Sequence, residues 1–359
     1  MKYGTLAGMK STWLLAILLC AGAWSGLYQP CYAADSDKAR VRAREAAPKV
    51  ARNVVLMIGD GMGSEHVWTA WLYNGSRLNI TSLPVTGFSI TTSASHGITD
   101  SAAGGTAIAC GCKAINGQLG LDADGCAVES LAARMRKAGK ATGIVVTKSV
   151  TDATPAAFYA HVKSRKDTSD IAAALVNAGF DVIAGGGSDD FTKEQLAELG
   201  QKTRMLELAA PGECEAPDKR GDWMPQQVEK ALRVLETDKD GFFLMVEGSR
   251  IDVEAHSNNL KKVIQETLDF DRAVGVVLEW MKKHPDTLLV VTADHQTGGL
   301  SITGADRNTG MVKGEFTTFR HSGVAVPVYA AGVGAARFTG VRENTALAPE
   351  IYRAAGMKP

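Results

Sequence analysis

The chain has 359 residues, and its 39 basic and 39 acidic side chains give a formal net charge of zero. This balance excludes the global positive field that would attract nucleic acid or an anionic membrane, so any recognition of charge is local. With 45% hydrophobic and 22% charged residues, the composition is that of a globular protein with one large or two ordinary domains. We expect no nucleic acid as a specific ligand.

The N-terminal segment has the pattern of a targeting sequence. Lys2 and Lys10 precede an apolar stretch at 13–24, WLLAILLCAGAW, and small residues follow it. We predict a secretory signal peptide over residues 1–33 and a charged, alanine-rich tether over residues 34–51. The alternative is a retained membrane anchor, although the apolar core is short for a span. Export would make the mature protein periplasmic or secreted, without membrane contact after the signal is removed.

Four cysteines remain beyond the signal peptide: Cys110, Cys112, Cys126 and Cys214. An exported protein meets an oxidising compartment in which disulfides form. Cys112 and Cys126 would close a short loop and are the preferred disulfide, but four cysteines allow three complete pairings and the others stay open. Their spacing does not suit a cysteine zinc site, which uses paired C-x-x-C ligands.

Apolar runs bounded by turn residues recur along the chain and predict buried strands. They lie at residues 53–58, 142–147, 182–183, 242–246, 288–292 and 326–331. Helical patterns lie between them at residues 129–138, 169–178 and 263–283. This alternation predicts an α/β fold with a mostly parallel central sheet and helices on both faces, in one catalytic domain over residues 52–359. The polar segment 188–240 is either a lid or an ordinary surface segment.

Ligands of such sheets bind at the carboxyl ends of the strands, so the polar residues beside the apolar runs are candidates for a site. They are Asp60, Asp252, His256, Asp294, His295 and His321. Carboxylate and imidazole together suit zinc, whereas carboxylates alone suit magnesium. Taken singly, each residue has an ordinary alternative as a turn residue, a surface histidine or a structural histidine.

Ser101 is the candidate nucleophile, in the sequence TDSAAGG. The small residues after it predict a helix that begins at or just before Ser101, and a helix N-terminus favours anions. The alternative is that Thr99 or Ser101 only caps this helix. Asp152 and Thr154 follow the second apolar run. Arg165, further along, suits a phosphate group because a guanidinium binds two oxygens at once.

In this order the motifs resemble the alkaline phosphatase family, across residues 53 to about 335. The matching stretches are IGDGMG at 58–63, TDSAAG at 99–104, DATPAA at 152–157, SRK at 164–166, VEGSRIDVEAH at 246–256 and TADH at 292–295. His321 completes the set. The resemblance implies an enzyme that hydrolyses a broad range of small phosphate monoesters through a phosphoserine on Ser101, with two zinc ions and one magnesium ion.

The resemblance also implies which residues hold each ion. The first zinc ion would be held by Asp252, His256 and His321. The second would be held by Asp60, Asp294 and His295. The magnesium ion would be held by Asp60, Thr154 and Glu247. Arg165 would bind the phosphate, with Asp100 and Asp152 in supporting positions.

The chain departs from the family pattern at two places. Val253 stands where many bacterial members have a lysine, which is expected to change the affinity for phosphate. The stretch between His295 and His321 is short, whereas larger members carry an insertion there that contributes to a dimer interface. The implied homodimer therefore stays an open expectation.

Three other functions are alternatives for a protein with these residues. A phosphodiesterase on the same fold is an alternative, although Thr154, Glu247 and Arg165 favour monoesters. A sulfatase is disfavoured because Ser101 lacks the following proline and arginine that such enzymes need. A non-catalytic binding protein is disfavoured because no expected ligand or nucleophile is missing.

Overall fold

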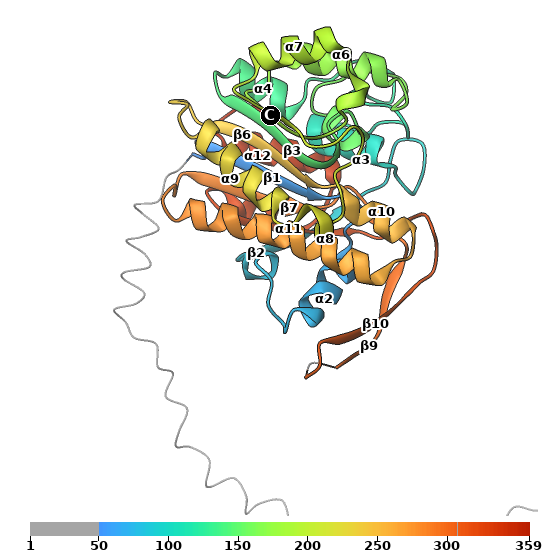
Figure 1. The fold of residues 1–359 in the computed structure, drawn as a ribbon. Coiled ribbons are helices and arrows are strands. Elements are labelled where there is room, and N and C mark those ends of the chain that lie inside the picture. The colour runs from blue at the N-terminus through green and yellow to red at the C-terminus, as the bar shows by residue number, and fades with distance from the viewer. Residues whose placement is uncertain (1–49, 307) are drawn as a thin grey trace, which may run out of the picture. The chain divides into compact units, whose positions relative to one another are not determined.

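One nine-stranded sheet organises the described part of the chain (Figure 1). The structure is a computed structural model and describes residues 50–306 and 308–359. The strands of the sheet are β1 (Asn53–Gly59), β2 (Val85–Ile90), β3 (Ala141–Ser149), β4 (Val182–Gly186), β5 (Met205–Leu208), β6 (Phe242–Gly248), β7 (Thr287–Thr292), β12 (Val326–Gly332) and β13 (Gly340–Glu343).

These strands run in the order β13-β2-β12-β7-β1-β6-β3-β4-β5. Strand β12 is antiparallel to both of its neighbours, and the other pairs in the sheet are parallel. The predicted α/β fold with a mostly parallel sheet is therefore confirmed. Two short ladders lie outside it, β9 (Leu300–Asp306) with β10 (Met311–Phe316) and β8 (Gln296–Thr297) with β11 (His321–Ser322).

Eleven α-helices and four short 3-10 turns connect the described strands. The helices are α2 (Ser64–Tyr73), α3 (Ser101–Cys110), α4 (Leu131–Lys137), α5 (Ala153–Ala156), α6 (Thr168–Ala178), α7 (Lys193–Lys202), α8 (Pro217–Arg220), α9 (Trp223–Leu235), α10 (Arg250–His256), α11 (Leu260–Met281) and α12 (Leu347–Ala354). The 3-10 turns are η1 (Ile80–Ser82), η2 (Ser188–Asp190), η3 (Ala335–Phe338) and η4 (Asn344–Ala346).

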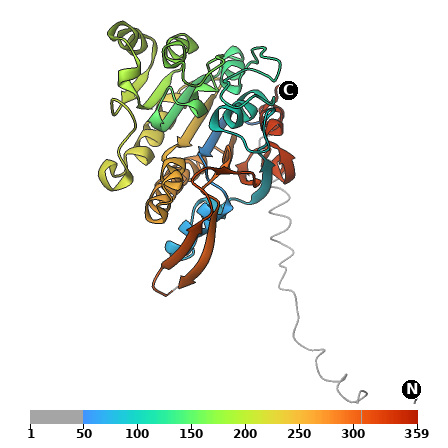
Figure 2. The same cartoon turned by 90° about the vertical axis from the view of Figure 1, so that its right-hand side faces the viewer.

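Helices cover both faces of the sheet, as predicted. Because side chains alternate along a strand, Leu56 and Ile58 of β1 pack into one core while Val55 and Met57 pack into another. The first core is completed by α3, α4, α6 and α12, and the second by α2, α9 and α11. In Figure 2, α11 (orange) and α12 (red) lie on opposite sides of the strands.

The six predicted strands are all present, within two or three residues of the predicted bounds. Strands β2, β5 and β13, which lie towards the two edges of the sheet, were not predicted from the sequence. Their residues are mostly exposed or half-buried, so they lack a continuous apolar run. The predicted helices correspond to α4, α6 and α11.

The polar segment 188–240 is neither a lid nor only a surface segment. Strand β5 forms one edge of the sheet, and α9 packs against α11. Met224, Val228 and Leu232 of α9 are fully buried in this contact layer. The segment is an integral part of the fold.

The predicted signal peptide, and the tether up to residue 49, lie outside the described residues. Ala51 is buried, and its N–H donates to the carbonyl of Ala354 over 2.8 Å. Within residues 50–306 and 308–359, no helix combines the length and the apolar character needed to cross a membrane.

The predicted disulfide between Cys112 and Cys126 is wrong for this structure, in which both cysteines are free thiols. Cys112 lies just beyond Gly111, whose left-handed backbone ends α3. Cys126 is exposed in a separate turn, where its N–H donates to Asp122 Oδ1 over 2.8 Å. The two cysteines thus lie in separate turns and are not bonded to each other. Cys110 and Cys214 are also unpaired.

Candidate active site

The predicted site residues meet at the carboxyl ends of β7, β1, β6 and β3, which are consecutive strands of the sheet. Asp60 directly follows β1, Glu247 lies near the end of β6, and Asp294 and His295 follow β7. The register aligns Ile58, two residues before Asp60, with Glu247 on the neighbouring strand. All four side chains are at most 1% exposed. The parallel sheet therefore buries acidic and imidazole groups together at one edge.

Two predicted histidine ligands have one ring nitrogen fixed by a backbone carbonyl. His256 Nδ1 lies 2.7 Å from the carbonyl oxygen of Phe319, and His321 Nδ1 lies 2.9 Å from that of Thr99. A carbonyl can only accept, so both Nδ1 atoms are the protonated donors. Both Nε2 atoms therefore carry lone pairs and are free to bind a cation.

These two lone pairs point at a single carboxylate. His256 Nε2 lies 3.3 Å from Asp252 Oδ1 and only 3.1 Å from His321 Nε2, which is itself 3.6 Å from Asp252 Oδ1. Three electron-rich atoms at this spacing repel one another unless a cation lies between them. Ligands about 2.0 Å from one tetrahedral zinc ion are separated by about 3.3 Å. The group formed by Asp252, His256 and His321 thus fits zinc. As predicted, Asp252 and His256 lie four residues apart on one face of α10.

A second group is formed by Asp60, Asp294 and His295. His295 Nε2 lies 3.4 Å from Asp60 Oδ1 and 3.2 Å from Asp294 Oδ2. The N–H groups of Gly61 and His295 donate to Asp294 Oδ1, which leaves Oδ2 without a hydrogen bond. Neither oxygen of Asp60 has a hydrogen-bond partner. Buried carboxylates without partners are costly, and a bound cation would remove that cost.

Thr297 links the two groups. Its hydroxyl donates to Asp252 Oδ1 over 2.5 Å and lies 3.2 Å from His295 Nδ1, which makes Nδ1 the donor and leaves Nε2 with its lone pair. The rings of His295 and His321 stack with centroids 3.6 Å apart. Gly61 has a positive φ of 69°, and a Cβ there would lie 2.7 Å from the Thr297 hydroxyl. Glycine is required at this turn for both reasons.

The third predicted set, Asp60, Thr154 and Glu247, is also unpartnered. Thr154 Oγ1 and both oxygens of Glu247 are buried without hydrogen bonds. Burial raises the pKa of Glu247 to about 8, with a further contribution from Asp152. Burial, followed by Asp252, raises the pKa of Asp294 to about 7. Carboxyls in this environment retain protons unless cations neutralise them. A hydroxyl with carboxylates is a set of oxygen donors that suits magnesium.

Ser101 begins α3, as predicted, and is 2% exposed. Its Oγ lies 3.2 Å from His295 Nε2, at the second group. The helix is capped by Asp100, whose Oδ1 accepts from the N–H of Ala103 over 3.0 Å. The alternative in which Thr99 or Ser101 serves as the cap is therefore wrong. Because Asp100 caps the helix, the Ser101 hydroxyl is free to face the metal-ligand groups.

Arg165 lies between the two supporting carboxylates. Its Nη2 is 3.2 Å from Asp152 Oδ1, and its Nη1 is 3.6 Å from Asp100 Oδ2. The side chain is 26% exposed, so it borders both the site and solvent. Burial alone would raise the pKa of Asp152, but Lys148 and Arg165 together lower it. Asp152 is thus an anion that orients two cations.

Two residues beside the site were not singled out from the sequence. Thr297 follows His295 by two positions and carried no motif signal. Lys148 forms an ion pair of 2.7 Å with Asp152, four residues later in the chain. That i,i+4 spacing of opposite charges was the one signal that could have identified Lys148.

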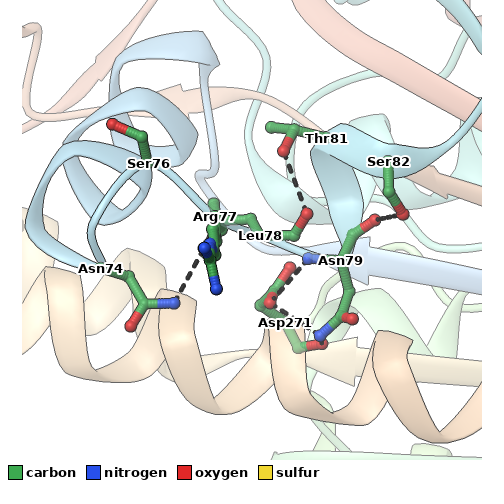
Figure 3. A pocket seen from close by; sticks show the side chains of 8 residues that line it. All are labelled: Asn74, Ser76, Arg77, Leu78, Asn79, Thr81, Ser82 and Asp271. Atoms are coloured by element: carbon green, nitrogen blue, oxygen red, sulfur yellow. Dashed lines mark hydrogen bonds between the residues drawn. The ribbon is translucent and has the colours of Figure 1, made fainter.

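An open hollow elsewhere shares no residue with this site (Figure 3). It is lined by Asn74, Ser76, Arg77, Leu78, Asn79, Thr81, Ser82 and Asp271. Asp271 accepts hydrogen bonds there from the N–H groups of Asn79 and Ile80. Through these hydrogen bonds the Asp271 carboxylate holds the turn after α2 against α11, so its role is structural.

Comparison with known proteins places the chain in a family. The family model described as alkaline phosphatase matches residues 51–210 and 195–314. Alkaline phosphatase 4 of Bacillus subtilis is 33% identical over 338 residues, 84% of this chain and 73% of the relative. The alkaline phosphatase of Escherichia coli is 30% identical over 86% of this chain and 87% of its own.

A solved structure has the same fold. The TAB5 alkaline phosphatase, in a histidine-to-aspartate mutant with Mg bound in the M3 site, superposes with a TM-score of 0.81 at 32% identity. The match covers 87% of this chain and 99% of the other. The chain belongs to the alkaline phosphatase family, whose members are phosphatases. It is therefore an enzyme that hydrolyses phosphate monoesters.

The role of Asp100 as the cap of α3 can be tested by two substitutions. Asp100→Ala removes the acceptor for the Ala103 N–H and should cost about 1 kcal/mol of unfolding free energy. Asp100→Asn keeps an acceptor oxygen and should cost much less. Urea unfolding monitored by circular dichroism measures both. Equal losses for the two variants would show that the cap is not what Asp100 contributes.

Proposed function

We propose that this phosphatase acts through a phosphoserine intermediate on Ser101, at a site for two zinc ions and one magnesium ion. The observation that carries the proposal is the cluster formed by the Nε2 atoms of His256 and His321, which lie 3.1 Å apart and within 3.6 Å of Asp252. Hydrogen bonds from the Nδ1 atoms to backbone carbonyls hold these two rings in place. A site built in this way is suited to a cation.

The donor atoms favour a particular assignment of ions. Asp252, His256 and His321 would hold one zinc ion, and Asp60, Asp294 and His295 would hold the other, because imidazole with carboxylate suits zinc. Asp60, Thr154 and Glu247 offer oxygen donors alone, which suit magnesium. The Mg in the M3 site of the TAB5 mutant supports a third ion of this kind. When bound, the ions would favour the ionised form of Ser101 and balance the charge of the phosphate and the leaving oxygen.

The residues of the chain account for the remaining steps. Ser101 Oγ forms a bond to phosphorus as the bond to the leaving alcohol breaks. The free N–H groups at the start of α3 and the guanidinium of Arg165 lie where they can bind the phosphate oxygens. A water molecule then cleaves the phosphoserine, which releases inorganic phosphate and restores Ser101.

Substrate range and context follow from the same proposal. The polar groups named above contact the phosphate, so small phosphate monoesters of many kinds are the expected substrates. Val253 stands where many bacterial members have a lysine, and a change in the affinity for phosphate is expected. We infer that residues 1–33 direct export and that residues 52–359 act as one catalytic domain in the periplasm or outside the cell. A homodimer is compatible with the proposal but is not required by it.

Replacing the nucleophile should separate binding from turnover. Ser101→Ala should lower kcat for p-nitrophenyl phosphate by about 10³-fold or more, because covalent transfer to the serine is lost. Zinc content and phosphate affinity should stay close to those of the unmodified protein. Ser95→Ala, at an exposed serine in the preceding loop, is the control and should behave as the unmodified protein. A variant at Ser101 that still turns over substantially without forming acid-stable phosphoprotein would refute the assigned nucleophile.

Metal removal should be fully reversible by the proposed ions. Chelation should abolish turnover, and zinc together with magnesium should restore it, because the imidazole ligands bind zinc in preference to harder cations. Turnover and metal content measured on the same samples check this. Recovery with calcium alone would contradict the ligand assignment.

The preference for monoesters can be measured directly against a diester. The enzyme should hydrolyse p-nitrophenyl phosphate faster than bis-p-nitrophenyl phosphate, because Arg165 and the start of α3 bind unesterified phosphate oxygens. The kcat/KM ratio of the two substrates is the test. Faster cleavage of the diester would favour the phosphodiesterase alternative.

A further inference from the structure

Lys148 places a positive charge beside the proposed magnesium ligands. It lies at the end of β3, and its ammonium is 2.7 Å from Asp152 Oδ2. Both side chains are 17% exposed. The contact is an ion pair. An ion pair with so little solvent contact is screened far less than a pair on the surface.

The segment that carries this pair is fixed by its own hydrogen bonds. The hydroxyls of Ser149 and Thr151 both donate to Asp190 Oδ2 over 2.5 Å. The N–H of Asp152 donates to the carbonyl of Ser149 over 3.0 Å and closes the turn. Arg165 occupies the other oxygen of Asp152. The turn therefore fixes the backbone next to Lys148, and the Lys148 side chain is directed to Asp152.

Val146, two residues before Lys148 on β3, pairs with Glu247 on β6, so the strand register places Lys148 near that proposed ligand. Asp152, the ion-pair partner of Lys148, lies two residues before Thr154. Burial alone would lower the pKa of Lys148, but Asp152 and Asp60 outweigh that effect and raise it. In turn, Lys148 acts to lower the pKa of both Asp60 and Glu247, against the larger effect of their burial. Lys148 already neutralises part of the negative charge at this position.

We propose that Lys148 is a fixed cation of the third metal site and that it weakens the affinity of this site for magnesium. The proposal rests on the assignment of Asp60, Thr154 and Glu247 to that ion. A divalent ion bound among these oxygens would be repelled by the nearby ammonium. The third site should therefore fill at higher magnesium concentrations than its ligands alone would require.

Magnesium binding to the zinc-loaded full-length protein tests this directly. Isothermal titration with MgCl₂ should show a Kd for Lys148→Met that is lower by about tenfold or more than for the unmodified protein. Lys148→Arg keeps the charge and should retain the original Kd. Lys163→Met removes one positive charge at an exposed position and is the matched control. Lys148→Gln replaces Lys148→Met if the latter does not fold.

A second measurement locates the effect. The thermal unfolding midpoint of Lys148→Met should rise at lower magnesium concentrations than the midpoint of the unmodified protein. The double variant Lys148→Met with Glu247→Gln should show no such rise, because a proposed magnesium ligand is lost. An unchanged or higher Kd in Lys148→Met would overturn the proposal. If the Lys148→Met variant with an unchanged Kd still formed phosphoserine and bound two zinc ions, only the inference about Lys148 would fail and the proposed function would stand. Absence of magnesium binding in every variant would remove the third ion and this inference together.

Discussion

The structure depends on the burial of negative charge at one edge of its sheet. Asp60, Glu247 and Asp294 lie at the ends of three adjacent parallel strands, and each is at most 1% exposed. Oxygens of all three lack hydrogen-bond partners. Because water does not reach these three carboxyl groups, it cannot reduce the repulsion between them. A bound cation would reduce it. Ser101 and Arg165 lie beside this site, where a phosphate group could bind once cations balance the negative charge.

The scaffold makes this arrangement possible with short connections. Asp60 directly follows β1, and Asp294 lies two residues after the end of β7. The positive φ of Gly61 lets the backbone turn without filling the space beside Thr297. The carbonyls of Thr99 and Phe319 fix the histidine rings from outside the site. Asp100 both caps α3 and approaches Arg165. Backbone groups thus help to position the side chains of the candidate site.

The sequence predicted the central strands and most of the site because these parts follow strong local rules. A strand buried on both faces, such as β1 or β7, is a continuous apolar run, and the polar residue after it is easily noticed. Strands β2, β5 and β13, at or next to the edges of the sheet, were not predicted because they are partly exposed. The Cys112–Cys126 disulfide was inferred from loop length, which does not reveal how each thiol is oriented. Thr297 acts through a contact with Asp252 that only the folded chain creates, whereas the partner of Lys148 is only four residues away in the sequence.

The central claim is that two zinc ions lie in two adjoining groups of this chain. Anomalous diffraction at the zinc edge, on crystals of protein purified without chelator, tests it most directly. We predict two peaks, one bounded by Asp252, His256 and His321 and the other by Asp60, Asp294 and His295. No zinc peak is expected between Thr154 and Glu247. A single peak, or peaks only outside these residues, would contradict the account.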